Sequence, residues 1–499
     1  MSEATSYNRR QQIGLGLGPA LFVLTHLFVT PAGLQPAANA VLASTLWIAT
    51  WWVTEAAPIP VTSLLPIVLF PVCGVTSAEG ATAPYANPIV FLFLGGFLVA
   101  LAIERWGLHR RIALKLLVRF GTDSRRLILG FMLITAFLSM WLSNTATAMM
   151  MVPIGMGVVA QRQALREPTQ ANPLADRTAD VLDAGSVEQS NFGTALLLGI
   201  AYAASIGGVA TLIGTPPNAI LAGVARAQLG IQIGFVEWMQ FGLPLAVSFL
   251  LVTWVLLLRL VPPEETVLPT GHEQIRSELH ALGPMGTGER RVVAVFLFLV
   301  LGWLLRPFVL EPLVPGLTDT VIAVVAGILV FLVPVDLRRG EFLLRWQDTT
   351  RVPWGVLVLF GAGFSIANAF QVSGLSAWIA GHFVGLRGVE FVWVLLAIAT
   401  LVVFLSEIAS NSATASLFIP IMAGLGAALL VSPLALMATV SVAASFAFML
   451  PVATPPNAIV FGSGYLTIPD MARVGFWLNL VGIAFLTVAS SLWLPVVWG

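Results

Sequence analysis

The sequence LSMWLSNTAT, at Leu138–Thr147, returns as LSEIASNSAT at Leu405–Thr414, 267 positions later. A second phrase follows each copy: GTPPNAI at Gly214–Ile220 and ATPPNAI at Ala453–Ile459, 239 positions apart. Two phrases repeated in the same order indicate that the chain consists of two homologous halves. The first half is therefore longer between its phrases, and we expect the polar stretch Gln161–Ser190 to hold the extra residues as a loop.

The composition indicates a membrane protein. Of the 499 residues, 58% are hydrophobic and only 10% are charged, whereas about 25% of the residues in a soluble domain are charged. Apolar runs such as Leu243–Leu258 and Val352–Ala369 approach the roughly 20 residues that cross a bilayer core. We expect an all-α, polytopic protein with about 11 transmembrane helices, inserted in the cytoplasmic (inner or plasma) membrane and surrounded by lipid.

Several other classes of protein are disfavoured by the same composition. The net charge is zero, so nothing suggests a nucleic-acid partner. Cys73 is the single cysteine, which excludes disulfides and cysteine metal sites within the chain. The polar start of the chain, with Arg9 and Arg10, runs into an apolar stretch without a small-residue cleavage pattern, so we expect no cleavable signal peptide.

The phrases and the polar stretches divide the chain into four parts. We expect an N-terminal segment with the first span (1–41), a first repeat (42–260), an inter-repeat loop (261–291) and a second repeat (292–499). Charge predicts how the repeats are oriented. Segment Arg105–Arg126 contains seven Lys and Arg residues, but its counterpart Val372–Trp393 contains only Arg387. Because positive charge near span ends stays in the cytoplasm, the two segments face opposite sides, which makes the repeats inverted.

The basic segment of the first half is also amphipathic. Leu108–Phe120 combines five basic or histidine side chains with Leu, Ile, Ala and Val. This pattern favours a helix that lies along the cytoplasmic interface. The alternative is a cytoplasmic extension of the preceding span.

The repeated phrases are polar, although they lie within hydrophobic sequence. Such groups are tolerated at membrane depth when they are buried in protein or line a wet cavity, and Ser and Asn favour helix caps and turns. We expect the tips of re-entrant hairpins, or breaks between half-helices, at Ser143-Asn144-Thr145 and Ser410-Asn411-Ser412. Free N–H groups at such helix starts suit an anion.

The same tips offer oxygen ligands for an alkali cation. Ser139 lies four residues before Ser143 on the same helical face, and Ser406 has the same relation to Ser410. The two Thr-Pro-Pro-Asn phrases supply a second wall, because prolines cannot continue a helix and leave carbonyl oxygens unpaired. We therefore expect two symmetric cation sites beside one anion site. The alternative is that the polar side chains only bond to neighbouring helices, which two matched copies disfavour.

These phrases, together with Leu282-Gly283-Pro284-Met285 before the second half, resemble those of the divalent-anion/sodium symporter family of di- and tricarboxylate transporters. The resemblance covers nearly the whole chain. It implies a homodimer in which each subunit has a scaffold domain and a transport domain. It also implies a secondary active transporter that takes up C4-dicarboxylates (succinate, malate or fumarate) with sodium, by an elevator motion.

The resemblance also implies ligands. Sodium, in two or more sites, would bind Ser139, Ser143, Asn144 and the backbone of Gly214 in one site, and Ser406, Asn411 and the backbones of Ala409 and Ala453 in the other. The substrate would contact Ser143, Asn144, Thr145, Thr215, Ser410, Asn411, Ser412, Thr454 and Pro455. One residue departs from the family pattern: Ser412 stands where the second motif usually has Thr, which puts the preferred substrate size in doubt.

Alternatives remain open at the level of sequence. A sodium-independent dicarboxylate exchanger, or a carrier of citrate or sulfate, would retain the same phrases. An integral-membrane enzyme would need a nucleophile and base or a metal cluster, which the repeated phrases lack, so we expect no enzyme. Glu407 has no equivalent in the first repeat, where Met140 stands. It is interpreted as structural, as tuning the second cation site, or as a proton relay.

Overall fold

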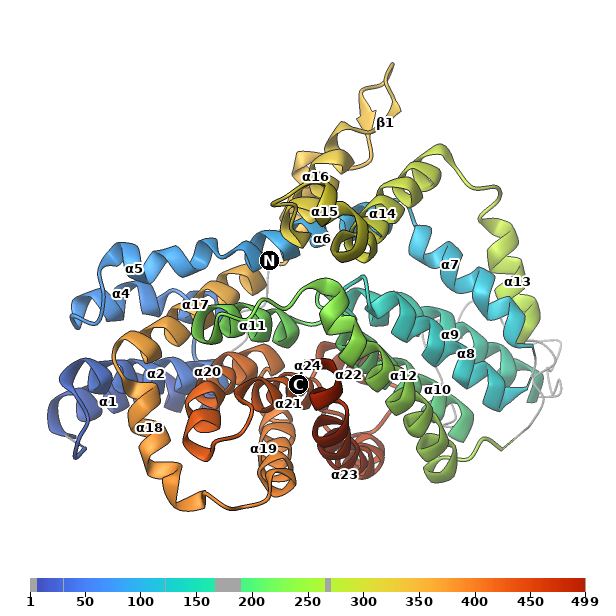
Figure 1. Cartoon of the computed structure of the whole chain (residues 1–499). Helices are drawn as coiled ribbons and strands as arrows, with labels where there is room; N and C mark the ends of the chain where they lie inside the picture. The colour runs from blue at the N-terminus through green and yellow to red at the C-terminus, as the bar shows by residue number, and fades with distance from the viewer. Residues whose placement is uncertain (1–6, 30, 122, 167–189, 265–270, 499) are drawn as a thin grey trace.

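The computed structural model describes residues 7–29, 31–121, 123–166, 190–264 and 271–498. Within these residues the chain is almost entirely helical (Figure 1). The only strands in this part of the chain are β1 (Pro334–Asp336) and β2 (Glu341–Phe342), a short antiparallel pair in which Pro334 lies opposite Phe342. The all-α expectation is therefore confirmed.

Four helices come first in the described part of the chain: α1 (Arg9–Phe28), α2 (Pro36–Thr54), α3 (Ile59–Thr62) and α4 (Leu65–Val72). Helices α1 and α2 form an antiparallel pair at one end of the molecule (Figure 1). The boundary expected at residue 42 falls inside α2, because Pro36 starts this helix earlier with its fixed φ angle.

The first repeat continues from α5 (Ala78–Thr82) and η1 (Ala83–Ala86) to α6 (Pro88–Arg105), α7 (Leu108–Leu117), η2 (Val118–Phe120), α8 (Ser124–Ser139), α9 (Asn144–Arg166), α10 (Asn191–Val209), α11 (Pro216–Val224), η3 (Ala225–Leu229) and α12 (Phe235–Leu260). The stretch expected as a loop begins as helix, since α9 reaches Arg166; residues 167–189 lie outside the described part.

From residue 346 on, the expected second repeat (292–499) contains η5 (Trp346–Arg351), α17 (Trp354–Val372), α18 (Leu375–Phe383), η6 (Val384–Leu386), α19 (Phe391–Ser406), α20 (Asn411–Leu429), α21 (Pro433–Ala444), α22 (Pro455–Gly462), α23 (Ile468–Leu492) and α24 (Leu494–Trp498). Helices α8 and α19 begin and end 267 positions apart, which is the spacing of the repeated phrases. The hairpins and broken helices expected from sequence are thus present in both repeats.

The connection between the repeats is more ordered than expected. It contains α13 (Gly271–Ala281), and α14 (Thr287–Leu305) begins before the expected end of the loop at 291. Gly286 starts α14 with Glu289 at its third position, where the Glu289 carboxylate accepts the Gly286 N–H at 2.7 Å. Three elements follow: η4 (Arg306–Leu310), α15 (Glu311–Leu313) and α16 (Asp319–Leu332).

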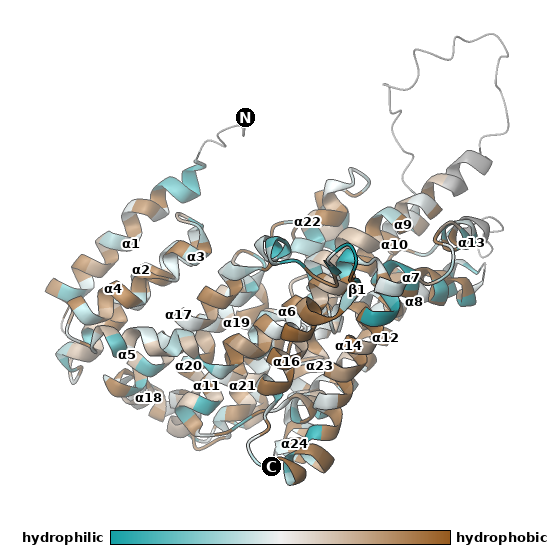
Figure 2. Ribbon diagram, turned by 90° about the horizontal axis from the view of Figure 1, so that it is seen from above, coloured by the Kyte–Doolittle hydropathy of each residue, from teal (hydrophilic) through white to brown (hydrophobic). Residues whose placement is uncertain are grey.

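Among the described residues, seven helices are long and apolar enough to cross a membrane, and five more apolar helices are shorter. The hairpin helix α19 and the half-helix α21 belong to the shorter group. Helix α19 stops inside a repeated phrase and α21 stops at the break before the next one, so length alone does not count the spans. The chain is a multi-pass membrane protein, and the figure of about 11 transmembrane helices stays a prediction. Hydrophobic residues dominate most helices, while hydrophilic ones gather at α7, near β1 and at the start of α1 (Figure 2).

The two broken helices form the centre of the molecule. Every residue of α10 from Phe192 to Val209 is buried, as is every residue of α21 from Leu434 to Ala444. The half-helix that follows each break packs against the other repeat: α11 contacts α17, α20 and α21, and α22 contacts α9 and α10. This exchange brings the breaks of both repeats to one interface.

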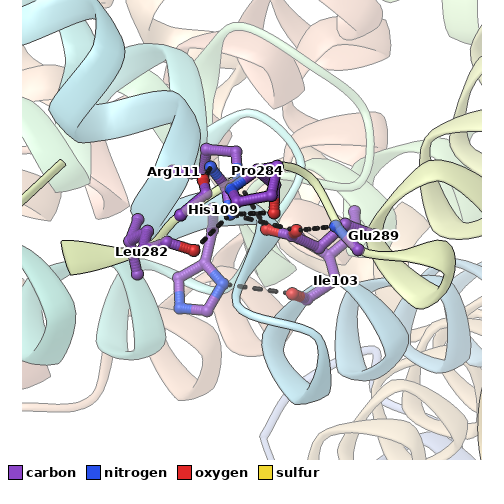
Figure 3. A network of polar contacts seen from close by, with 8 residues as sticks. Ile103, His109, Arg111, Leu282, Pro284 and Glu289 are labelled. Atoms are coloured by element: carbon purple, nitrogen blue, oxygen red, sulfur yellow. Dashed lines mark hydrogen bonds and ion pairs between the residues drawn. The ribbon is translucent and has the colours of Figure 1, made fainter. Parts of the chain in front are cut away.

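The amphipathic segment forms α7, as expected. The Arg111 guanidinium of α7 makes several hydrogen bonds to the connection between the repeats (Figure 3). It donates to Glu289 at 2.6 Å and to the carbonyl oxygens of Leu282 and Gly283 at 3.1 and 2.7 Å. Nearby, His109 Nδ1 lies 3.1 Å from the Ile103 carbonyl oxygen, and burial lowers the pKa of His109. The Leu-Gly-Pro-Met phrase therefore binds α7 through the hydrogen bonds of Arg111. That α7 lies along the membrane interface remains a prediction.

Candidate functional site

The repeated phrases of both halves line a single cavity of about 1010 Å³. The first repeat contributes residues 143–146 and Gly214-Thr215-Pro216, and the second contributes residues 410–412 and 453–456. Of the proposed substrate contacts, all nine line this cavity: Ser143, Asn144, Thr145, Thr215, Ser410, Asn411, Ser412, Thr454 and Pro455. Segments up to 313 positions apart in sequence therefore meet here.

Four helices begin at the cavity wall. Helix α9 starts at Asn144 and α20 at Asn411, each directly after a hairpin tip. Helix α11 starts at Pro216 and α22 at Pro455, each after a break. The first N–H groups of a helix have no partner within the helix, and its dipole is positive at this end. Prolines occupy the first two positions of α11 and α22 and have no N–H, so these two starts contribute their dipoles, while α9 and α20 also offer N–H groups. Four such ends around one cavity suit an anion with two charged groups.

The four starts are capped differently in the two repeats. Ser143 Oγ accepts the Ala146 N–H at 3.1 Å, and Thr454 Oγ1 accepts the Asn457 N–H at 3.3 Å. The side chains of Thr215 and Ser410, at the equivalent positions, make no such cap bond. Each repeat thus leaves one hydroxyl free of capping. We therefore expect the Thr215 and Ser410 hydroxyls to reach a carboxylate at least cost.

The expected first cation site is compact and rich in oxygen. Ser139 is fully buried, and its Oγ lies 2.7 Å from both the Ala204 carbonyl oxygen and Asn144 Oδ1. The same end of the Asn144 amide lies 3.1 Å from Ala204 O and 3.3 Å from Gly214 O. Rotation of the amide by half a turn would let its nitrogen donate to these oxygens. The Ser139 hydroxyl donates to one of these oxygens, and what the site offers a cation is the cluster of oxygens from Ser139, Ala204 and Gly214 within 3.3 Å of the Asn144 amide.

The close approach of two glycines shapes this site. A Cβ added to Gly214 would lie 2.4 Å from Gly208 O, and one added to Gly208 would lie 2.6 Å from Asn144 Oδ1. The equivalent positions in the second repeat are Ala447 and Ala453. The two sites are therefore related but not identical.

The expected second site shows unpaired oxygens. Ser406 Oγ and Asn411 Oδ1 are buried and have no hydrogen-bond partner among the described residues. Ala453 lines the cavity, and Ala409 is buried in the hairpin tip but not in the cavity wall. Buried oxygens without a donor are costly unless a cation or water meets them. The donor set of this tip therefore also fits a hard cation.

Each break is held open by the Asn of its Thr-Pro-Pro-Asn phrase. Asn218 Nδ2 donates to Thr211 O at 2.8 Å and to Gly208 O at 3.3 Å. Asn457 Nδ2 makes the equivalent bonds, to Leu450 O at 3.1 Å and Ala447 O at 3.2 Å. The sequence interpretation gave these two Asn residues no role, although their recurrence 239 positions apart was the available signal.

One ion pair lies at the wall of the cavity. Arg351 Nη2 lies 2.9 Å from Glu104 Oε2, and the Arg351 side chain is 59% exposed. Both residues line the cavity. No sequence pattern predicted this ion pair, because its two residues are 247 positions apart and neither has an equivalent in the other repeat. The carbonyl oxygen of Ala204, which lies beside Ser139, was also missed, because a main-chain contact does not depend on the residue type.

Comparison with known proteins gives three findings. The family model described as "Sodium:sulfate symporter transmembrane region" matches residues 12–499. The Sodium-dependent dicarboxylate transporter SdcS of Staphylococcus saprophyticus is 42% identical over 100% of this chain and 94% of its own length. The protein of the same name from Staphylococcus aureus strain USA300 is 41% identical, over 99% of this chain and 93% of its own.

Among solved structures, the chain resembles the Alcanivorax borkumensis YdaH transporter, whose crystal structure is described as having an unusual topology. The TM-score is 0.55 with 18% sequence identity, over 91% of this chain and 99% of that one. At this identity the likeness concerns the fold alone.

Proposed function

We propose a function on the premise that this chain belongs to the sodium:sulfate symporter family. The protein is a secondary active transporter that couples sodium entry to the uptake of C4-dicarboxylates such as succinate, malate and fumarate. The chain is a transporter and not an enzyme, and its cargo includes Na⁺. The dicarboxylate is assigned by analogy with the two relatives, whose names state that substrate. The resemblance stated from sequence is thereby confirmed at the level of the family.

The observation that carries the proposal is the meeting of four helix starts with two oxygen-rich tips at one cavity. Among the described lining residues, Arg351 is the only Lys or Arg. A dianion therefore has helix dipoles, amides and hydroxyls as partners, with little formal positive charge. Because a buried charge is stable only when it is compensated, bound Na⁺ ions supply the missing charge. Sodium binding then precedes or accompanies binding of the anion.

The proposed ligands are those of the sequence interpretation, with Ala204 O added to the first site. The first Na⁺ contacts Ser139, Ser143, Asn144 and the main chain of Gly214. The second contacts Ser406, Asn411 and the main chains of Ala409 and Ala453. Asn144 and Asn411 belong to both the cation sites and the substrate site, so each couples the two cargoes directly.

The position of the cavity supports a proposal about the side of the membrane to which this conformation opens. It follows α6 from Phe93 to Glu104, next to the Arg-rich α7. Since positive charge marks the cytoplasmic side, this end of the cavity faces the cytoplasm. We propose an inward-facing state of an elevator, in which both hairpins and both broken helices move as a transport domain against a scaffold. A homodimer in lipid would give the scaffold a fixed partner.

Two related activities compete with this proposal. A dicarboxylate exchanger would use the same anion site but run without a sodium gradient. Citrate or sulfate would be a substrate of another size; the serine at position 412, one methyl smaller than threonine, favours no one of these anions by itself.

The test is uptake of radiolabelled succinate by the purified protein in liposomes. An inward Na⁺ gradient is compared with equimolar K⁺ or choline, and internal succinate is present or absent. Accumulation that requires Na⁺ and no internal anion supports the symporter. Uptake that requires internal dicarboxylate and ignores Na⁺ makes the protein an exchanger. Transport of citrate or sulfate in place of succinate would retain the coupling and change the substrate.

A further inference from the structure

Glu407 is a buried carboxylate in the tip of the second hairpin, between Ser406 and Asn411 in sequence. It is 3% exposed. One carboxylate oxygen, Oε1, accepts the main-chain N–H groups of Phe448 at 2.7 Å and Met449 at 2.9 Å; the other, Oε2, accepts that of Leu450 at 3.0 Å. No Lys, Arg or His among the described residues forms an ion pair with it. Its charge is met by N–H dipoles instead.

The main chain that Glu407 holds is the break between α21 and α22. Leu450 O, in that break, accepts Asn457 Nδ2 at 3.1 Å and the Ala453 N–H at 3.1 Å. One wall of the second cation site comes from the hairpin tip and the other from Ala453. Glu407 therefore joins the two walls through three hydrogen bonds, and Asn479 Nδ2 of α23 braces its Oε1 at 2.6 Å.

The first repeat joins the same two positions by a different bond. Met140 stands at the place of Glu407, and Thr211 at the place of Leu450. There the Thr211 Oγ1 hydroxyl donates to the Met140 carbonyl oxygen at 2.6 Å. In one repeat the break supplies the side chain and the tip supplies main chain; in the other these roles are reversed. The link is retained although neither residue is.

We propose that Glu407 is a positioning residue for sodium binding: it fixes the hairpin tip against the break so that Ser406, Asn411 and Ala453 present their oxygens at one point. Thr211 does the same for the first site. The inference rests on the proposed sodium-coupled function. It assigns to Glu407 a role in geometry, which distinguishes it from a proton relay and from a source of negative charge.

The decisive experiment moves the first repeat's link into the second. Glu407→Met removes the three bonds, and Glu407→Met with Leu450→Thr rebuilds the Thr211–Met140 arrangement without a carboxylate. Binding of Na⁺ is measured without substrate, from the rise in thermal unfolding midpoint of protein in nanodiscs as NaCl replaces choline chloride. Uptake of succinate gives the half-saturating Na⁺ concentration, KM and kcat in parallel.

We expect Glu407→Met to raise the half-saturating Na⁺ concentration by about tenfold, since hydrogen bonds to a charged group are lost. The double variant should return to within about threefold of the wild type. Two controls accompany it. Met140→Leu, which keeps the Met140 main chain, should leave the Na⁺ dependence unchanged. Asn479→Leu removes one of four donors and should have a smaller effect than Glu407→Met.

The outcomes separate the inference from the function on which it rests. A wild type without a Na⁺ effect on stability or uptake defeats the proposed symport itself. A wild type that responds to Na⁺, with Glu407→Met responding equally, overturns the positioning role alone. The positioning role is also overturned if the double variant does not recover and Glu407→Gln is as impaired as Glu407→Met. That result would assign the effect to the negative charge of Glu407. If Glu407→Met does not fold, Thr211→Val tests the same link in the first repeat.

Discussion

At the scale of single residues, the two proposed cation sites are related by the repeat but differ in how tightly they are packed. The first has Gly208 and Gly214 in contact behind Asn144, where the second has Ala447 and Ala453. Alanine is the natural residue at position 453, but at the equivalent position 214 its Cβ would collide with Gly208. Interiors this close-packed respond to a single added methyl group.

Gly214→Ala is expected to impair the first cation site, although alanine is the natural residue at the equivalent position of the second. The added Cβ would lie 2.4 Å from Gly208 O, so the break must shift and Gly214 O moves away from Asn144. We expect the half-saturating Na⁺ concentration to rise by about tenfold or more, for an overpacking cost of 1–3 kcal/mol. Sodium titration of uptake measures it. Gly462→Ala, with open space around it, is the matched control; equal effects of both changes would contradict the argument.

Asn144→Ala and Asn411→Ala should each abolish coupled uptake. Each change removes a cation ligand and an anion donor together, so the two cargoes lose their shared contact. We expect succinate uptake to fall at least about 100-fold, as when buried partners are left unpaired. Uptake and Na⁺-dependent thermal stabilisation are measured together. Retention of wild-type uptake by either variant would contradict the shared tip.

At the scale of elements, the positions of helix starts decide what the cavity can bind. Four starts converge because each half-helix packs against the opposite repeat. The elements that carry them are themselves anchored elsewhere. Helix α7, which precedes the first hairpin, is fixed to the connection between the repeats by Arg111, whose partner Glu289 is equally buried, each side chain being 11% exposed.

Arg111→Gln is expected to destabilise the folded protein by about 3 kcal/mol, because it leaves Glu289 buried without its partner. It also removes the bonds to the carbonyl oxygens of Leu282 and Gly283. The next residue gives a matched control: Arg110 pairs with Glu278 at 3.2 Å but is 50% exposed, so Arg110→Gln should cost less than about 1 kcal/mol. Thermal unfolding midpoints of both variants test the difference, and similar midpoints would refute it.

At the scale of the whole molecule, one side chain of the first helix contacts the second hairpin in the state that we propose to be inward-facing. Arg10 of α1 donates to the carbonyl oxygen of Ile408, in the hairpin tip, at 2.6 Å, and also to that of Val53 at the end of α2. One side chain thereby joins a helix of the proposed scaffold to the proposed transport domain. An elevator motion that carries the hairpin away must break the bond to Ile408.

Arg10→Gln should shift the population of the protein away from the inward-facing state. Loss of a charged hydrogen bond made in only one state favours the other by up to about tenfold. The measurement is maleimide labelling, from the cytoplasmic side, of Val452→Cys in a Cys73→Ser background; Val452 lines the cavity and is 77% exposed. We expect slower labelling after Arg10→Gln, with Arg9→Gln as the control. An unchanged rate would show that this contact does not bias the states.

The sequence by itself determined the class of the protein, the two repeats, the four places where helices stop and start, and the family. These features are local: Pro, Ser and Asn act on their own stretch of backbone, and the repeat spacing is visible without a fold. The family resemblance also implied nine substrate residues, all of which line one cavity.

Only the tertiary structure decided how the repeats pack against each other and which different residues link the hairpin tip to the break in each repeat. Contacts between distant segments place α11 and α22 against the opposite repeats, form the Glu104–Arg351 pair and bring Ala204 O, the proposed ligand, to Ser139. The sequence showed Glu407 and Met140 as a mismatch. The structure shows that a hydrogen bond joins the same two positions in both repeats. The side chain of the bond can come from either position, as a donor in Thr211 and as an acceptor in Glu407. Packing fixes the distance between the two backbones and not the identity of the residues.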